Sequence, residues 1–287
     1  MSAKVSGIDL EVFQALNKNF SGLLELKNFF GNGSTARVYH VEQGFGSHGE
    51  YKVQRIAKVF RHDLTDMPPV DVAKICQQEI ETLLAVGHTN IVSLYDVGTL
   101  TINEQASTNY YLMEYLAEAC DLQVFFNTKF ETAVPGPEKR VFVLTVLIEI
   151  AQGLCGLHLQ NIFHCDLKLG NVLVGRMGTE WITKITDFGF SKATLDGGRV
   201  EVADQTTRLF TTLDYLPKRF RRAPYMTSDA GNPDRVTVRI PKAELTAQFD
   251  LHYVGGILSR LLDMPLVAGS FEPHELAYLR RMIVRMN

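Results

Sequence analysis

The sequence of 287 residues lacks the features that mark several common classes of protein. Its four cysteines include no Cys-x-x-Cys pair, so we expect reduced thiols rather than a disulfide framework. Its net charge of −3 argues against general binding to nucleic acid. Internal repeats, low-complexity tracts, a signal-peptide core and an apolar run of the roughly 20 residues needed to span a membrane are all missing. These absences predict a soluble intracellular protein, cytoplasmic or nuclear, that neither enters a membrane nor binds nucleic acid strongly.

Hydrophobic residues make up 46% of the chain, which is enough to bury a core in each of two lobes. Helical spacing of apolar residues predicts helices near 8–17, 70–86 and 138–160. Strand patterns precede the last of these helices, near 24–30, 36–43, 50–60, 92–99 and 109–115. We therefore predict an α+β fold, with a small antiparallel sheet and one helix ahead of a mainly helical part.

Two short motifs carry the strongest chemical signal. The first is His164-Cys165-Asp166-Leu167-Lys168-Leu169-Gly170-Asn171, and the second is Asp187-Phe188-Gly189. They supply a candidate base, a cation and two oxygen ligands suited to Mg²⁺, namely Asp166, Lys168, Asn171 and Asp187. Transfer of a phosphoryl group from ATP to a hydroxyl needs these groups. Each Asp or Asn could instead cap a turn, but two motifs that agree in type and order argue against that alternative.

Upstream motifs fit the same chemistry. Gly31–Val38 has glycines spaced to let backbone amides close over phosphates, although a Gly-x-Gly turn by itself is as often a plain hairpin. Lys58 lies at the end of an apolar strand pattern. Glu79 and Glu81 follow on a predicted helix, where Glu81 is better explained as a solvated charge on the helix surface.

In combination, these motifs resemble the eukaryotic-type protein kinases, on the serine/threonine side, over about residues 24–262. The resemblance implies a bilobal protein kinase fold. Its parts are an N-terminal extension with a short helix (1–23), an N-lobe and hinge (24–116), and a C-lobe (117–287). It also implies ATP and Mg²⁺ as cofactors, with Mn²⁺ as a substitute, and a protein as substrate.

The resemblance gives a role to each matching position. It implies catalytic roles for Asp166, Lys168, Lys58 and Glu79, and metal binding by Asn171 and Asp187. It also implies that Glu79, rather than the competing Glu81, is the partner of Lys58. The implied ATP-binding residues are Gly31, Asn32, Gly33, Ser34, Val38, Ile56, Lys58, Met113, Glu114, Leu116, Asp121 and Leu173. The residues implied to support the site are His164, Phe188, Thr212 and Asp250. Asp121 has an equally good alternative role, because an aspartate at this place can cap the helix that follows.

Three residues depart from the family pattern. Ile56 stands where a small alanine usually faces the nucleotide base, so we expect weak binding of ATP. Cys165 stands where an arginine often gathers an activation-loop phosphate, which predicts activity without phosphorylation of Thr206, Thr207 or Thr211. Arg219 replaces a glutamate, so the usual ion pair of that glutamate with a late arginine cannot form.

The predicted central helix at Asp250 is followed by fewer residues than in most protein kinases, which predicts a shortened C-lobe. This feature resembles the baculovirus-type, virus-encoded protein kinases. Those enzymes are associated with a small, Arg/Ser-rich DNA-packaging protein, so the resemblance implies a basic substrate, which Glu118, Asp121 and Asp214 would suit. The helix at 8–17 and the shortened end make a homodimer a further expectation.

Three alternatives to an active protein kinase remain open. A pseudokinase scaffold is suggested by Ala36, Ile56 and Arg219. A small-molecule phosphotransferase of related fold is disfavoured by Lys168 and Thr212. The basic run Lys218–Arg222 could bind nucleic acid or direct nuclear import, although a solvated loop is the better explanation.

Overall fold

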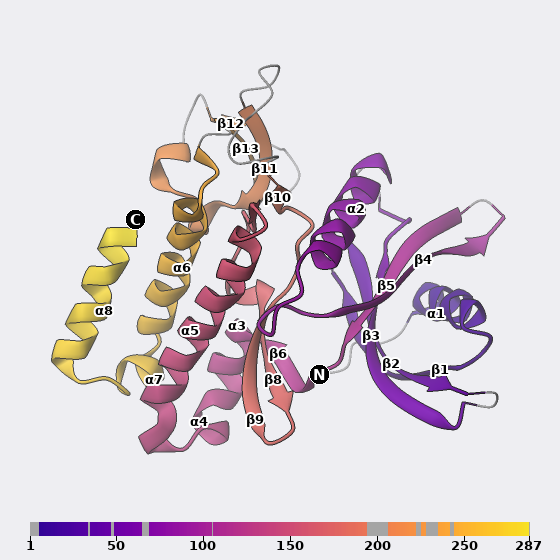
Figure 1. Ribbon diagram of the computed structural model, residues 1–287, viewed down its shortest axis with the longest axis horizontal. Coiled ribbons are helices and arrows are strands. Elements are labelled where there is room, and N and C mark those ends of the chain that lie inside the picture. Colours follow the sequence, from indigo (N-terminus) through magenta and orange to yellow (C-terminus); the bar gives the residue numbers. More distant parts are fainter. Residues whose placement is uncertain are drawn as a thin grey trace. The chain divides into compact units, whose positions relative to one another are not determined.

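Figure 1 shows the computed structural model of the chain, which describes residues 6–33, 35–46, 49–64, 69–104, 106–193, 206–221, 225–227, 235–241 and 244–286. The chain divides into two compact units, Met1–Leu84 with Val92–Tyr115 and Ala85–Ile91 with Leu116–Asn287. We call the first the sheet unit and the second the helical unit.

The sheet unit contains a five-stranded antiparallel sheet in the order β1-β2-β3-β5-β4. Its strands are β1 (Leu24–Asn32), β2 (Ala36–Phe45), β3 (Tyr51–Phe60), β4 (Leu94–Asn103) and β5 (Ala106–Glu114). Helix α2 (Pro69–Ala85) joins β3 to β4. The antiparallel sheet predicted from the sequence is confirmed, with strand ends that differ by a few residues.

Helix α1 (Gly7–Asn19) covers one face of this sheet. It begins with a capping box, in which the Ser6 side chain and the Asp9 side chain each accept from the other residue's backbone N–H. Its apolar residues Val12, Phe13 and Leu16 are buried in one core with side chains of β1 to β5. The predicted helix at 8–17 is therefore present, and tertiary packing stabilises it.

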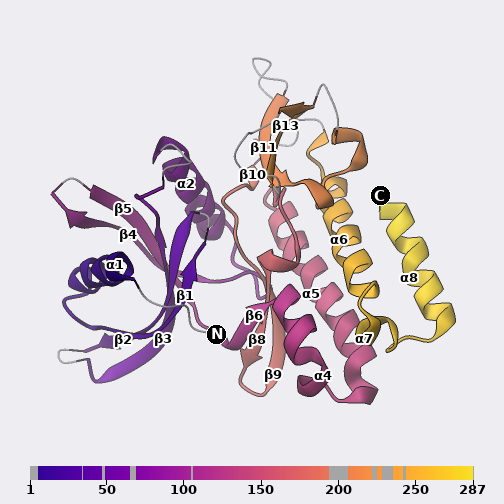
Figure 2. The same cartoon turned by 180° about the vertical axis from the view of Figure 1, so that it is seen from behind.

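The helical unit is built around α5 (Lys139–His158) and α6 (Ala247–Leu262), which contact each other (Figures 1 and 2). Helix α8 (Pro273–Met286) packs against α6, and α7 (Pro265–Ala268) connects them. The shorter elements are β6 (Ala117–Asp121), α3 (Leu122–Val124), η1 (Phe125–Lys129), α4 (Phe130–Ala133), η2 (Gly136–Glu138), β7 (Ile162–Phe163), η3 (Leu169–Asn171), β8 (Val172–Met177), β9 (Glu180–Ile185), β10 (Lys192–Ala193), β11 (Thr206–Thr212), η4 (Leu213–Tyr215), η5 (Lys218–Phe220), β12 (Met226–Thr227) and β13 (Arg235–Pro241).

Three small sheets accompany these helices, in the orders β6-β8-β9, β10-β7 and β11-β13-β12. In these small sheets, the longest ladder joins β11 to β13 in antiparallel register, from Thr206 opposite Pro241 to Thr212 opposite Arg235. Sequence patterns do not predict this ladder, because β11 and β13 are short and their partnership depends on residues far apart in the chain. It places Thr212 at the end of a paired strand.

The apolar run of α5 corrects one prediction. Gly136–His158 is long and apolar enough to cross a membrane, by length and composition only. The prediction that no run reaches that length is therefore wrong by these criteria. The helix contacts β9, β7, α6 and α7, as a core helix does. Its buried residues are Val143, Val146, Ile150, Gly153, Leu154 and Leu157.

All four cysteines are free thiols, as the sequence predicts. Cys76 and Cys165 are buried, Cys120 is half-buried, and Cys155 is exposed on α5. Burial raises the pKa of the Cys76 thiol to about 12.

Candidate functional site

Lys58 and Glu79 form a buried ion pair in the sheet unit. Lys58 lies on β3 and donates from Nζ to both carboxylate oxygens of Glu79 on α2, at 2.7 and 2.8 Å. The hydroxyl of Tyr111 donates to Glu79 Oε1 at 2.9 Å. Glu79 is fully buried, and a buried charge is tolerated when it is paired and hydrogen-bonded. The predicted pairing is present, whereas Glu81 is exposed on α2 and accepts from Gln77.

The glycine-rich loop connects β1 to β2. Gly31 has a φ of +122°, in the region that favours glycine. The N–H of Gly33 donates to the carbonyl of Ala36 at 2.8 Å and closes a tight turn. Asn32 is the last residue of β1 and Ser34 lies outside the described residues. The described part of the loop therefore contains a tight turn, and its binding of phosphate stays a prediction.

Val38 and Ile56 share the face of the sheet that carries Lys58. Val38 is the direct cross-strand partner of Lys58, and Ile56 precedes it by two residues on β3. Ile56 is only 8% exposed, so its larger side chain occupies space on this face. The effect of Ile56 on a nucleotide base stays a prediction.

An aromatic stack that the sequence patterns do not predict lies on the same face. The ring of His40, the cross-strand partner of Ile56, stacks on Tyr115 with centroids 4.1 Å apart and an interplanar angle of 4°. Phe30 of β1 also stacks on His40, with centroids 6.3 Å apart. No local pattern indicates the stack, because its three rings come from three separate segments. The stack extends the apolar surface beside Ile56.

The predicted hinge residues are divided between β5 and the chain that follows it. Met113 of β5 pairs with Ile56 across the sheet and is 8% exposed. The N–H of Glu114 donates to the Ser93 carbonyl at 3.0 Å, so this N–H already has a hydrogen-bond partner within the sheet unit. Leu116 is buried in the helical unit, where its carbonyl accepts from Ala119.

Asp166 is the centre of a hydrogen-bond network in the helical unit. Its Oδ1 accepts from the backbone N–H of Thr212 at 3.0 Å and from the Thr212 hydroxyl at 3.2 Å. Its Oδ2 accepts from Lys168 Nζ at 2.9 Å and from Asn171 Nδ2 at 3.4 Å. Lys168 also donates to the Thr212 hydroxyl at 3.1 Å. The network fixes a carboxylate, an ammonium group and a hydroxyl within hydrogen-bonding reach of one another.

Asp250 braces the loop that precedes Asp166. Its carboxylate is fully buried on α6 and accepts from the backbone N–H of His164 at 2.9 Å and of Cys165 at 3.0 Å. The Nε2 atom of His158 lies 2.8 Å from the same carboxylate. Cys165 has a φ of +63°, a strained conformation for a residue with a side chain. Asp250 therefore stabilises a loop shape that would otherwise cost free energy.

Asn171 and Asp187 offer oxygens of the kind that Mg²⁺ prefers. Asn171 donates from Nδ2 to the Asp166 carbonyl at 2.8 Å, which leaves its amide oxygen as the atom able to bind a cation. Asp187 has a φ of +66°, and strained residues cluster at functional sites. Among the described residues no three His, Cys, Asp or Glu side chains gather around one point.

The two predicted supporting aromatic residues contact each other. The rings of His164 and Phe188 lie 5.2 Å apart, and Phe188 is fully buried. The Nε2 atom of His164 lies 3.2 Å from the Thr186 carbonyl, just before Asp187. This contact links the Asp166 loop to the segment that carries Asp187.

Asp121 and Leu173 are cross-strand neighbours on β6 and β8. Asp121 Oδ1 accepts from the Val124 N–H at 2.8 Å and caps α3, so the structure contains the alternative role that the sequence offers for it. Glu118 lies 3.9 Å from Arg176 in an exposed ion pair. Both acidic residues therefore have partners within the helical unit.

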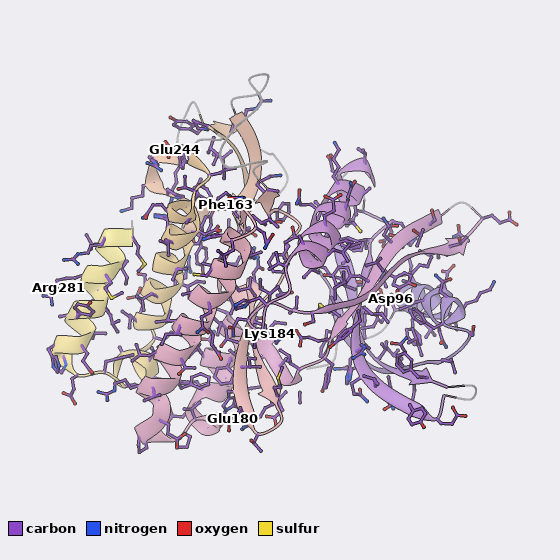
Figure 3. The ribbon with its side chains drawn as sticks, in the orientation of Figure 1. Asp96, Phe163, Glu180, Lys184, Glu244 and Arg281 are labelled. Atoms are coloured by element: carbon purple, nitrogen blue, oxygen red, sulfur yellow. The ribbon has the colours of Figure 1, made fainter. Side chains whose placement is uncertain are left out.

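Two charged residues that follow Thr212 in the chain, Asp214 and Arg219, form ion pairs. Arg219 donates to Glu244, labelled in Figure 3, at 2.7 Å. Arg260 of α6 donates to Asp214 at 2.8 Å. At the position where the family has a glutamate, Arg219 therefore supplies the positive partner of an ion pair. Asp214 is already paired with Arg260.

The basic run after Asp214 is partly structural. Arg221 donates to the carbonyls of Leu216 and Asp214, at 2.6 and 2.9 Å. Lys218 is exposed, and Arg222 lies outside the described residues. Arg221 therefore has partners within the protein, and the solvated-loop explanation stays a prediction.

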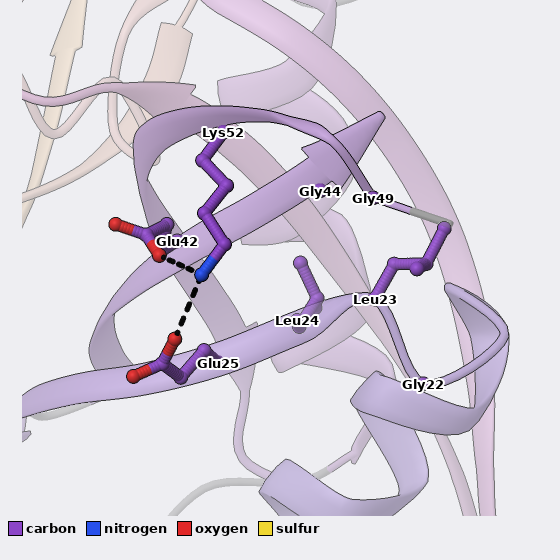
Figure 4. Close-up of a pocket in the computed structure, with 8 residues that line it drawn as sticks. All are labelled: Gly22, Leu23, Leu24, Glu25, Glu42, Gly44, Gly49 and Lys52. Carbon is purple, nitrogen blue, oxygen red and sulfur yellow. Dashed lines mark hydrogen bonds and ion pairs between the residues drawn. The ribbon is translucent and has the colours of Figure 1, made fainter. Parts of the chain in front are cut away.

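A pocket of about 310 Å³ lies elsewhere in the sheet unit (Figure 4). Among its charged lining residues, Lys52 pairs with Glu42 at 2.9 Å and with Glu25 at 3.5 Å, so one lysine faces two glutamates. It is lined by Gly22, Leu23, Leu24, Glu25, Glu42, Gly44, Gly49 and Lys52. The pocket contains none of the predicted site residues.

Comparisons with known proteins agree with this geometry. The chain matches the protein kinase domain family over residues 24–229. It is 26% identical to the probable serine/threonine-protein kinase PknB of Lactococcus lactis, over 86% of this chain and 32% of that protein. It is 33% identical to the serine/threonine-protein kinase TOS3 of Saccharomyces cerevisiae, over 42% of this chain and 20% of that protein. An Aurora kinase of Eremothecium gossypii is 26% identical over 78% of this chain and 53% of that protein. The chain thus spans between a fifth and about half of the length of these relatives, and it belongs to the protein kinase domain family.

Proposed function

We propose that the chain transfers the γ-phosphoryl group of ATP to serine or threonine hydroxyls of protein substrates. The substrate oxygen forms a bond to the γ-phosphorus, the bond from that phosphorus to the bridging β-γ oxygen breaks, and ADP leaves. The hydroxyl proton passes to the Asp166 carboxylate and then to solvent. Lys168 neutralises charge on the transferred group, and Lys58, held by Glu79, neutralises charge on the α- and β-phosphates.

The single observation that carries this proposal is the network around Asp166. Lys168 and Thr212 both bond to the Asp166 carboxylate, at 2.9 and 3.2 Å, and to each other at 3.1 Å. A carboxylate held in this way is preorganised to accept a proton, and the ammonium group beside it is placed for a phosphate. The lysine two residues after the aspartate supports serine and threonine as acceptors.

Mg²⁺ is part of the proposal. The amide oxygen of Asn171 and the carboxylate of Asp187 suit a hard cation, and the phosphates of ATP supply further oxygens. When bound, the ion neutralises phosphate charge. Mn²⁺ accepts the same ligands and is the proposed substitute.

The experiment is transfer of label from γ-labelled ATP to a generic protein and then to an arrayed peptide library. We expect transfer that requires a divalent cation, occurs on serine and threonine, and disappears in Asp166→Asn. This variant keeps the size of the side chain, so a folded but inactive Asp166→Asn protein separates chemistry from stability. A wild-type protein that transfers no label under any cation would refute the proposal.

A pseudokinase scaffold is the second candidate, and Ile56 is the observation that favours it. Its side chain lies on the same face as Lys58 and is 8% exposed, so it restricts the space for a nucleotide base. A scaffold binds nucleotide or partners without turnover. Labelled product in the wild type, absent in Asp166→Asn, excludes this candidate.

We further propose that the chain is a baculovirus-type kinase, acts on an Arg/Ser-rich DNA-packaging protein and forms a homodimer. The resemblance of the sequence supports the first two parts, and exposed apolar side chains on α5 and α8, such as Ile148 and Val284, support association. Matched peptides with Arg-rich and Glu-rich flanks test the substrate. A light-scattering mass tests the homodimer.

A further inference from the structure

A buried charge cluster lies at the base of the glycine-rich loop. Arg37, which directly follows the loop on β2, is 1% exposed, and so is Asp9 of α1. Arg37 Nε donates to Asp9 Oδ1 at 2.9 Å, and its two terminal nitrogens donate to Asp63 at 3.0 and 2.8 Å. A bidentate, charge-assisted contact of this kind is strong and geometrically specific. The cluster therefore fixes where the Arg37 side chain can lie.

Asp9 joins this cluster to the beginning of α1. Its second oxygen, Oδ2, accepts from the Ser6 hydroxyl at 2.6 Å and from the Ser6 N–H at 3.0 Å. Its backbone carbonyl accepts from the buried Tyr39 hydroxyl at 2.9 Å. Burial opposes ionisation of Asp9, but the hydrogen bonds from Ser6 and Arg37 outweigh it and lower its pKa. One side chain thus serves both as a helix cap and as the partner of the loop arginine.

Arg37 and Val38 are adjacent residues on opposite faces of β2. Val38 is paired with Lys58, on the face assigned to the nucleotide, whereas Arg37 is paired with Val59 on the face that α1 covers. A second contact holds the loop backbone, because the N–H of Arg61 donates to the Thr35 carbonyl at 2.8 Å. A displacement of Arg37 therefore moves the strand that positions both Val38 and the end of the glycine-rich loop.

We propose that Asp9 and Arg37 are positioning residues that hold the glycine-rich loop in the shape that binds the phosphates of ATP. Helix α1 contributes to nucleotide affinity through them, although it packs on the opposite face of the sheet. The assignment deepens the proposed function and rests on it for the identity of the ligand. In this proposal the buried carboxylate of Asp9 holds Arg37, and Arg37 holds the strand that follows the phosphate-binding loop.

The test is Asp9→Asn, which keeps the shape of the side chain and removes its charge. We expect the KM for ATP to rise about tenfold while kcat changes less than about twofold, because nucleotide binding is weakened and the Asp166 network is untouched. The Kd of a non-hydrolysable ATP analogue should rise by a similar factor. The matched control is Leu16→Ala on the same helix, which is fully buried and makes no hydrogen bond or ion pair to the cluster with its apolar side chain. It should lower Tm at least as much but leave the KM for ATP within about twofold.

Tyr39→Phe is the second variant, because it keeps the ring and removes only the hydrogen bond to Asp9. It should raise the KM for ATP about twofold to threefold. If Asp9→Asn does not fold, this variant decides the question. The proposal would be overturned if Asp9→Asn and Leu16→Ala had equal KM values for ATP. If Asp9→Asn is unfolded, an unchanged KM for ATP in Tyr39→Phe would overturn it. Absence of phosphoryl transfer in the wild type would refute the kinase activity instead, and analogue affinities would still decide the role of Asp9.

Discussion

The carboxylate of Asp250 accepts a hydrogen bond from the backbone N–H of Cys165 at 3.0 Å, at a residue whose φ is +63°. The same carboxylate accepts from the His164 N–H at 2.9 Å. One buried acidic group on α6 thus holds two consecutive amides of the loop that leads to Asp166. The shape of that loop depends on a helix that begins about 80 residues later in the chain.

Replacing Asp250 should therefore damage both stability and activity. In Asp250→Asn the amide nitrogen is a donor and cannot accept from a backbone N–H, so at least one buried donor loses its partner. We expect the free energy of unfolding to fall by about 2–4 kcal/mol and kcat to fall with it. Urea unfolding and phosphoryl-transfer assays measure the two effects. Full stability of this variant would contradict the bracing role.

The Thr212 hydroxyl should matter for turnover more than for folding. Thr212→Val keeps the shape of the side chain but removes the group that bonds to Asp166 and Lys168. We expect kcat to fall about tenfold, with a change in unfolding free energy below about 1 kcal/mol. Thr212→Ser keeps the hydroxyl and should retain most of the activity, which makes it the matched control.

Activity should not require phosphate on the segment that contains β11. Cys165 is fully buried, and burial raises the pKa of its thiol, so it stays neutral and cannot attract a phosphate. The backbone ladder with β13 holds β11 without a charged partner at Cys165. We expect phosphatase treatment, checked by mass spectrometry, to leave kcat within about twofold. Loss of turnover in a protein that remains folded would show that the prediction is wrong.

Shortening Ile56 should increase affinity for ATP. In Ile56→Ala we expect a lower KM for ATP, because space opens on the face that carries Lys58. The same change removes buried methyl groups and should cost about 2–4 kcal/mol of stability. Ile56→Val costs about 1 kcal/mol and should give a smaller change in KM in the same direction. An unchanged KM in both variants would show that Ile56 does not restrict the nucleotide.

Asp63 should support stability only above acidic pH. Burial opposes ionisation of Asp63, but hydrogen bonds from Arg37 and Arg61 lower its pKa far below the unfolded value of about 3.9. Its contribution is therefore complete above the unfolded pKa and is lost as pH falls through the folded pKa. Asp63→Asn should cost about 1–2 kcal/mol at neutral pH, and the difference from wild type should shrink below about pH 4. Urea unfolding from pH 3 to 7 measures this, with Glu25→Gln as an exposed control.

Local motifs predict the candidate site residues that lie close together in sequence. The glycine turn, the strand that carries Lys58 and the loop from His164 to Asn171 each have their own pattern. The β11–β13 ladder and the contact of Asp9 with Arg37 have none, because each depends on the pairing of separated segments. The apolar composition of α5 was visible, but periodicity alone does not tell a core helix from a membrane-spanning one.

The unequal exposure of the four thiols gives a practical means of following the protein in solution. Cys76 and Cys165 are buried and Cys120 is half-buried, whereas Cys155 is exposed on α5. Because reactivity follows thiolate character and access, a maleimide dye at mildly alkaline pH should modify Cys155 first. A fluorescent reporter can thus be attached to the central helix of the helical unit without removing any native cysteine.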